Sequence, residues 1–151
     1  IFEERKEKNP CSLCAKMRKG ALNEAIKARG CNKVAYAHHK DDIIETLFMS
    51  LIYEGRINTF SPRTYLDRTD LTVIRPLLFV DEAEIASYSH DMGLPVTKSY
   101  CAADGFTKRE STKELLSGIY RNNPGARERI FGAILNQEFP GWPKRINRYE
   151  K

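Results

Sequence analysis

Apolar positions follow two periods along the chain. Helical spacing recurs in five stretches, which predict helices over residues 11–29, 43–54, 81–92, 107–121 and 124–136. Short apolar runs at 34–37 and 71–75 predict buried strands. The polar stretch 56–70 indicates a loop or an irregular hairpin with a possible short strand at 64–66, and residues 94–97 have the length of an edge strand. Strands that alternate with helices indicate an α/β fold with a parallel sheet. Because the strands are few for so many helices, the pattern predicts a partial sheet flanked by helices.

Capping residues support several of these helix limits. Gly30, Gly55 and Gly93 stand where the first three helical patterns stop, as glycine does after a helix. Asp81 and Glu84 have the spacing of a capping box, in which the first side chain and the fourth bond each other's backbone N–H groups. The predicted helix ends therefore rest on local chemistry as well as on periodicity.

Paired histidines and aspartates follow the first predicted strand, at His38, His39, Asp41 and Asp42. In open α/β sheets, ligands bind at the carboxyl ends of the strands, where loops and helix N-termini converge. We therefore predict that His38 and Asp42 face an open cleft at that edge. A purely structural alternative is a capping box over Asp42-Ile-Ile-Glu45, in which Asp42 is the N-cap.

Composition adds weaker indications. The 151 residues include 25 Lys+Arg against 20 Asp+Glu, a net charge of +5 that suits an anionic partner such as nucleic acid. The sequence has neither an apolar run long enough to span a bilayer nor a signal-peptide pattern, which favours a cytoplasmic protein. We divide it into a charged lead-in (1–9), a main region (10–136) and a tail (137–151). The tail is expected to be less ordered unless Phe139 and Trp142 dock in an apolar groove.

Four cysteines are present, and two of them form a Cys11-Ser-Leu-Cys14 motif at a predicted helix start. An isolated C-x-x-C motif is compatible with a redox pair, half of a zinc site or two iron–sulfur ligands. Cys31 precedes a strand and is expected to be a buried small hydrophobe, as free cysteines usually are. Cys101, considered alone, carries the same expectation.

Taken together, four separated motifs resemble one family. They are Cys11-Ser-Leu-Cys14-Ala-Lys-Met-Arg18-Lys-Gly20, Ala37-His38-His39-Lys-Asp41-Asp42-Ile43-Ile-Glu-Thr46-Leu, Ile74-Arg75-Pro76-Leu77 and Cys101. In this order they resemble the tRNA 2-thiocytidine biosynthesis enzymes of the PP-loop ATP pyrophosphatase superfamily, from about Pro10 to Asn136. The resemblance implies an adenine-nucleotide α-hydrolase-like fold. It also implies that sulfur replaces a cytidine carbonyl oxygen in the tRNA anticodon loop.

The resemblance assigns roles to individual residues. It implies that ATP adenylates the cytidine with the help of Mg²⁺, near Asp42 and its neighbours Asp41 and His38. Arg18 corresponds to a cation that stabilises developing negative charge. The thiolates of Cys11, Cys14 and Cys101 would hold a [4Fe–4S] cluster. The implied partners are tRNA and a sulfur donor, either a cysteine desulfurase or sulfide, and a homodimer is an assembly to be tested.

One family motif is missing from these residues. The Ser-Gly-Gly-x-Asp-Ser loop, whose backbone N–H groups cradle pyrophosphate, does not occur in the sequence. Together with the start at Ile1, this leads to the expectation that the chain is a carboxyl-terminal fragment, inactive by itself.

Two other functions remain open from the sequence. In a metal-dependent phosphoesterase, His38, His39, Asp41 and Asp42 would bind two divalent ions. In a non-catalytic tRNA-binding remnant, basic residues of the last two predicted helices would contact phosphates. Such charges more often form a solvated helix face; they are Lys108, Arg109, Lys113, Arg121, Arg127 and Arg129.

Overall fold

The computed structural model describes residues 10–97, 101 and 107–136. They fall into two compact units, 1–99 and 100–151. The predictions for the lead-in and for the tail with Phe139 and Trp142 lie outside the described residues. The first unit contains α1 (Pro10–Ala28), β1 (Lys33–Ala35), α2 (Lys40–Met49), the π-helical η1 (Ser50–Glu54), β2 (Arg63–Leu66), β3 (Leu71–Ile74) and α3 (Glu82–Asp91). The second unit contains α4 (Lys108–Asn122) and α5 (Ala126–Asn136).

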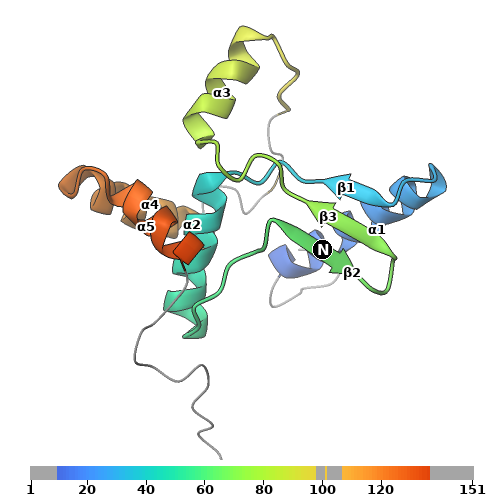
Figure 1. The fold of residues 1–151 in the computed structure, drawn as a ribbon, viewed down its shortest axis with the longest axis horizontal. Coiled ribbons are helices and arrows are strands. Elements are labelled where there is room, and N and C mark those ends of the chain that lie inside the picture. The colour runs from blue at the N-terminus through green and yellow to red at the C-terminus, as the bar shows by residue number, and fades with distance from the viewer. Residues whose placement is uncertain (1–9, 98–100, 102–106, 137–151) are drawn as a thin grey trace, which may run out of the picture. The chain divides into compact units, whose positions relative to one another are not determined.

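The sheet of the first unit has three strands in the order β1-β3-β2 (Figure 1). β1 is parallel to β3, with Val34 opposite Val73, and α2 lies in the connection between them. β2 is antiparallel to β3, so the sheet is mixed and not purely parallel as predicted. A short turn causes this difference: only the four residues 67–70 separate β2 from β3, and a parallel pair needs a crossover of a dozen residues or more.

The buried apolar residues of the first unit come from α2, from β1 and β3, and from Leu78 in the segment after β3. Ile43 and Ile44 of α2 are 4% and 0% exposed, and the buried strand side chains are Val34, Leu71 and Val73. The predicted apolar stripe of this helix is therefore confirmed in its first turns. For the last part of the helix the predicted burial is wrong. There α2 passes into η1, whose apolar side chains Leu51 and Ile52 are exposed.

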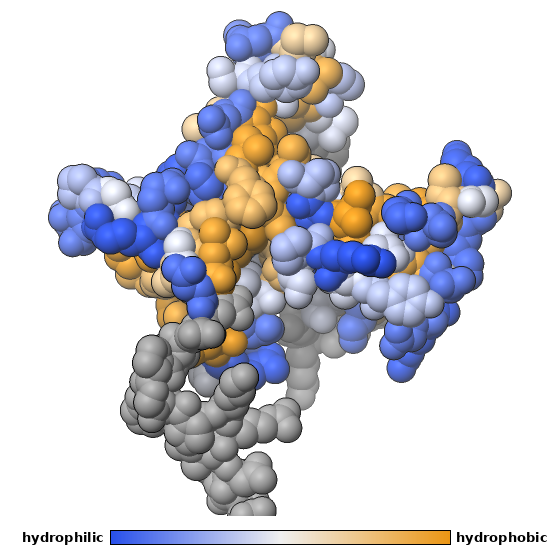
Figure 2. Space-filling view, viewed as in Figure 1, coloured by the Kyte–Doolittle hydropathy of each residue, from blue (hydrophilic) through white to orange (hydrophobic). Residues whose placement is uncertain are grey.

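The α3 helix has a confirmed start and an unexpected surface. Asp81 is its N-cap, and the capping box with Glu84 is present. No residue of α3 is buried, so its apolar side chains, Ile85, Tyr88 and the following Met92, are not packed into the core. The helix projects from the sheet in Figure 1, and Figure 2 shows apolar surface around it.

Residues 94–97 do not form the expected edge strand. They are exposed throughout, with Val96 at 79%, and Pro95 lacks the N–H group that a strand ladder uses. Without an apolar face to bury or a full set of donors, this segment gains little from joining a sheet.

The two helices of the second unit match their predictions closely. α4 starts after Thr107, whose side-chain oxygen accepts from Glu110 N at 3.2 Å. Leu116, Phe131 and Ile134 are buried. The predicted apolar stripes are only partly correct, because two of their members are exposed, namely Leu115 and Leu135. None of the helices within the described residues is long and apolar enough to cross a membrane.

Two glycines of one helix give a matched test of the fold. Gly20 lies inside α1 with open space where a Cβ would stand, whereas Gly30 ends the helix at φ +71°. Gly20→Ala should raise the free energy of unfolding by about 1 kcal/mol through helix propensity. Gly30→Ala should lower it by about 1 kcal/mol, because the left-handed conformation strains a Cβ. Urea denaturation followed by circular dichroism measures both; equal shifts would contradict this account of the helix end.

Candidate functional site

The turn between β1 and α2 carries the paired histidines and aspartates. His39 is the N-cap of α2, in extended backbone at φ −119° and ψ −178°. The Asp42 carboxylate accepts from His39 N at 3.1 Å and lies 3.3 Å from His39 Nε2. Asp42 is thus the third helical residue and forms a capping box with the N-cap His39. The capping alternative is therefore confirmed in its chemistry and wrong only in making Asp42 the N-cap, because the helix starts earlier. Its side chain is 21% exposed, and its orientation towards a cleft stays a prediction.

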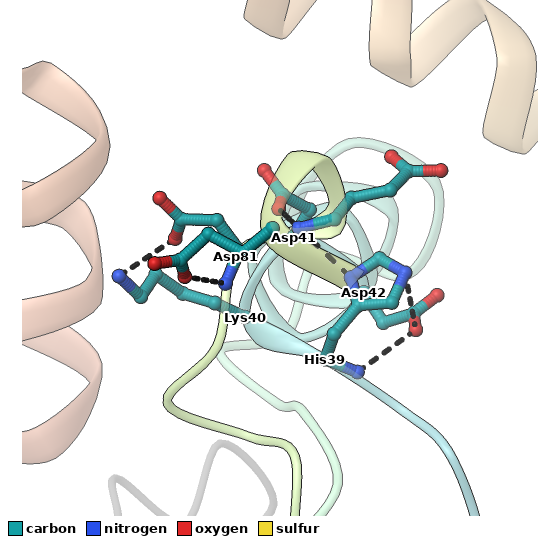
Figure 3. A network of polar contacts seen from close by, with 7 residues as sticks. His39, Lys40, Asp41, Asp42 and Asp81 are labelled. Carbon is teal, nitrogen blue, oxygen red and sulfur yellow. Dashed lines mark hydrogen bonds and ion pairs between the residues drawn. The ribbon is translucent and has the colours of Figure 1, made fainter. Parts of the chain in front are cut away.

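The neighbouring Lys40 and Asp41 point towards α3 (Figure 3). Both are buried, each with 9% of its surface exposed. Lys40 Nζ lies 2.7 Å from Asp81 Oδ1, and Asp41 Oδ2 accepts from Glu82 N at 2.8 Å. The two aspartates therefore accept backbone hydrogen bonds from different elements, Asp42 from its own helix start and Asp41 from the start of α3, and the His39 ring lies near both, 3.9 Å from Asp41 Oδ2.

An aromatic cluster surrounds His38 at the carboxyl ends of β1 and β3. The His38 ring lies 5.6 Å from that of Tyr36 and 4.6 Å from that of Phe60, centroid to centroid. The Arg75 guanidinium stacks over Phe60, with Cζ 5.0 Å from the ring centroid. Sequence reasoning missed Tyr36 and Phe60, although the position of Tyr36 at the end of a strand was a usable signal.

Arg75 ties the end of β3 to the segment before β2. Its Nη1 donates to Ser61 O at 2.5 Å and to Thr64 Oγ1 at 3.1 Å. Burial lowers the pKa of the Arg75 guanidinium, and the nearby Tyr36 raises it in part. The side chain is thus held by hydrogen bonds and stacking in a partly desolvated place beside His38.

The cysteines lie in separate parts of the fold. Cys11 and Cys14 occupy the first turns of α1 three residues apart, exposed and half-buried respectively, so their prediction as a pair at a helix start is confirmed. Three-residue spacing places both on one helix face, and soft thiolates suit an iron–sulfur cluster. Cys101 is exposed and belongs to the second unit, so its place beside the pair stays a prediction.

Cys31 is exposed, which corrects the expectation of a buried hydrophobe. It follows Gly30 in the turn after α1, and its Sγ lies 3.9 Å from Arg29 O. A rise of about 1.5 Å per residue along α1 sets this turn roughly 20 Å or more from the Cys11–Cys14 end. Arg18 is exposed on α1 one turn after Cys14, and its proposed cationic role is not tested by its position.

A two-metal site does not form around the histidines and aspartates. Among residues 10–97, 101 and 107–136, no three His, Cys, Asp or Glu side chains are grouped so as to hold a metal ion. Instead, the His39 ring lies near both Asp42 and Asp41, and Asp41 also accepts from the backbone of α3. The phosphoesterase alternative therefore lacks the donor set that it requires.

Comparison with known proteins settles the family. The profile of the PP-loop domain matches residues 6–104, more than half of the chain. The chain belongs to the PP-loop domain family. The expected family and the α/β class are thereby confirmed, with a small mixed sheet in the described residues.

Curated relatives are similar over most of this chain. The tRNA-cytidine(32) 2-sulfurtransferase of Cereibacter sphaeroides is 37% identical over 127 residues, which are 83% of this chain and 44% of the relative. The enzyme of the same name from Cupriavidus necator is 35% identical over 130 residues, 85% of this chain and 41% of the relative. The chain thus spans less than half the length of the curated relatives it matches.

A solved structure supports the fold. The U34-tRNA thiolase NcsA from Methanococcus maripaludis, determined with its [4Fe-4S] cluster, superposes with a TM-score of 0.68. The match covers 94% of this chain and 49% of that chain, at 24% sequence identity. At this identity the likeness establishes the architecture alone.

The contacts of Arg75 generate a prediction about stability. Arg75→Lys should lower the free energy of unfolding by about 1–2 kcal/mol, because an ammonium cannot stack on Phe60 and also reach Ser61 and Thr64. Urea denaturation measures the loss. Arg63→Lys, at an exposed position on β2, serves as the control and should change little. Equal effects of the two variants would show that the planar guanidinium is not required.

Proposed function

We propose that this chain is the carboxyl-terminal part of an ATP-dependent tRNA sulfurtransferase. The full protein would adenylate a cytidine in the anticodon loop and replace its 2-carbonyl oxygen with sulfur. The observation that carries this proposal is 35–37% identity to enzymes of that name over 83–85% of the chain. The motif order from the Cys11–Cys14 pair to Arg75 agrees with this similarity.

The turn after β1 supplies chemistry that such a reaction needs. A pyrimidine carbonyl oxygen is a poor leaving group, and ATP supplies the activation by converting it to an adenylated one, with Mg²⁺ as counter-charge. Asp42 would hold the nucleotide's metal, and His38 would lie beside the nucleotide. Arg18 would oppose negative charge that develops during transfer. Asp42 suits this role because its carboxylate stands at a helix start on the carboxyl edge of the sheet.

The cysteines would provide the sulfur-handling site. Cys11 and Cys14, one turn apart at the start of α1, fit two thiolate ligands of a [4Fe–4S] cluster, and Cys101 would be the third. Three protein ligands would leave one iron position for the incoming sulfur. The sulfur donor would be a cysteine desulfurase or sulfide, and the tRNA substrate would place the enzyme in the cytoplasm. A homodimer is an assembly that a mass measurement would test.

The family's phosphate loop is absent from these 151 residues. ATP binding therefore needs residues that this sequence does not contain, and the 44% coverage of the relative leaves ample length for them. Activity is accordingly a property of a longer polypeptide in which these residues take part.

A chimera tests the function. When this chain replaces the matched segment of the Cereibacter sphaeroides relative, it should restore 2-thiocytidine in tRNA from cells that lack the enzyme, measured by nucleoside mass spectrometry. In that chimera, Asp42→Asn should reduce product roughly 100-fold, as expected for loss of a group that stabilises charge. Asp91→Asn, on the exposed end of α3, is the matched control.

Each outcome of this experiment is informative. A folded chimera that binds tRNA without forming 2-thiocytidine would favour the non-catalytic remnant. Full activity of the Asp42→Asn chimera would remove that carboxylate from the reaction while leaving the family assignment intact.

Cluster assembly gives a second test. After anaerobic reconstitution of the chimera, Cys11→Ala, Cys14→Ala and Cys101→Ala should each lower bound iron and sulfide severalfold, because each removes a thiolate ligand. Cys31→Ala should bind as much iron as the parent, since Cys31 lies at the far end of α1. Four irons bound equally well by the Cys101 variant would exclude that residue as a ligand.

A further inference from the structure

The α3 helix is attached to the rest of its unit at its N-terminus. None of its residues is buried, and Tyr88 and Met92 are 60% and 59% exposed. Its start, in contrast, lies against the first two residues of α2. Lys40 N donates to Val80 O at 3.0 Å, in addition to the Lys40–Asp81 ion pair and the Glu82–Asp41 hydrogen bond. Polar contacts at one end therefore orient a helix that apolar packing does not hold.

These contacts satisfy the chemistry of a helix start. The first N–H groups of a helix have no partner within it, and the positive end of its dipole favours a carboxylate. Asp41 meets both needs at Glu82 N, although it comes from a different helix. Lys40 forms an ion pair with Asp81, the N-cap of α3, next to the acidic side chains of Glu82 and Glu84 in the first turn of that helix. A cation at the first position of α2 is otherwise unfavourable, so its burial there is explained by its partner on α3.

We propose that Lys40 and Asp41 are positioning residues, which fix the start of α3 against the start of α2. In this arrangement Asp41 accepts from the first N–H group of α3, that of Glu82, beside the N-cap Asp81. Of the two adjacent aspartates, only Asp42 would then hold the metal of the nucleotide. The second half of this inference rests on the proposed function, whereas the first half stands on the contacts alone. Asp41 thus differs from the role that the family resemblance gave it.

Backbone hydrogen exchange in the full chain tests the capping contact. Asp41→Ala should accelerate exchange at Glu82 N about fivefold, which corresponds to about 1 kcal/mol for loss of a helix cap. Asp41→Asn keeps an oxygen that accepts from Glu82 N and should stay within about twofold of the parent. Asp91→Ala at the other end of α3 is the matched control. Unchanged exchange in Asp41→Ala would overturn the proposal.

The ion pair provides a second measurement should Asp41→Ala fail to fold. Lys40→Met keeps the apolar stem of the side chain, and Asp81→Asn keeps an N-cap oxygen. Each should speed exchange in the first turn of α3 severalfold, and the double variant should be no worse than the more damaging single one. Strictly additive effects would show that Lys40 and Asp81 do not act together.

Activity of the chimera separates positioning from ligand binding. The chimera with Asp41→Asn should form 2-thiocytidine at a rate within about threefold of the parent. The amide oxygen can still accept the hydrogen bond of the helix start, whereas a neutral amide could not replace a carboxylate that binds a metal ion. Asp41→Ala should lose activity together with the protection of α3. If Asp41→Asn abolishes activity while α3 stays protected, Asp41 is a ligand and the inference fails. An inactive parent chimera would count against the proposed function, and the exchange result would still decide the capping role.

Discussion

Parallel pairing of β1 with β3 is the constraint on which the rest of the first unit depends. Because the two strands run in the same direction, their carboxyl ends meet at one edge of the sheet. The segment after β1 brings His38 and the start of α2 to that edge, and the segment after β3 brings Arg75 and the start of α3. Residues about forty positions apart, such as Asp41 and Glu82, therefore come within hydrogen-bonding distance.

Features that depend on local chemistry could be predicted from the sequence. The Asp81–Glu84 box and the glycine ends at Gly30 and Gly55 use partners a few residues away, so their spacing alone is diagnostic. The predicted start of α2 is three residues late, because Asp42 suits either end of a capping box. Periodicity likewise identified η1 as helical but not as a π-helix with exposed apolar side chains.

Features that depend on distant partners could not be predicted. Phe60 reaches His38 from a loop whose sequence gave no sign of it. The exposure of Cys31 reflects the end of α1, not the general tendency of cysteine to be buried. For the candidate site, the motif located the turn correctly, but only the contacts distinguish the roles of adjacent side chains.

Helix geometry explains why two adjacent aspartates would have different tasks. Successive residues on an α-helix point about 100° apart, so neighbouring carboxylates can make their hydrogen bonds to different elements. At the start of α2, Asp41 accepts from the backbone of α3 and Asp42 from the backbone of His39, while the His39 ring lies near both carboxylates. A single Asp-Asp sequence can therefore fix the position of a second helix and also present a carboxylate at the edge of the sheet, which links the rigidity of the turn to its chemistry.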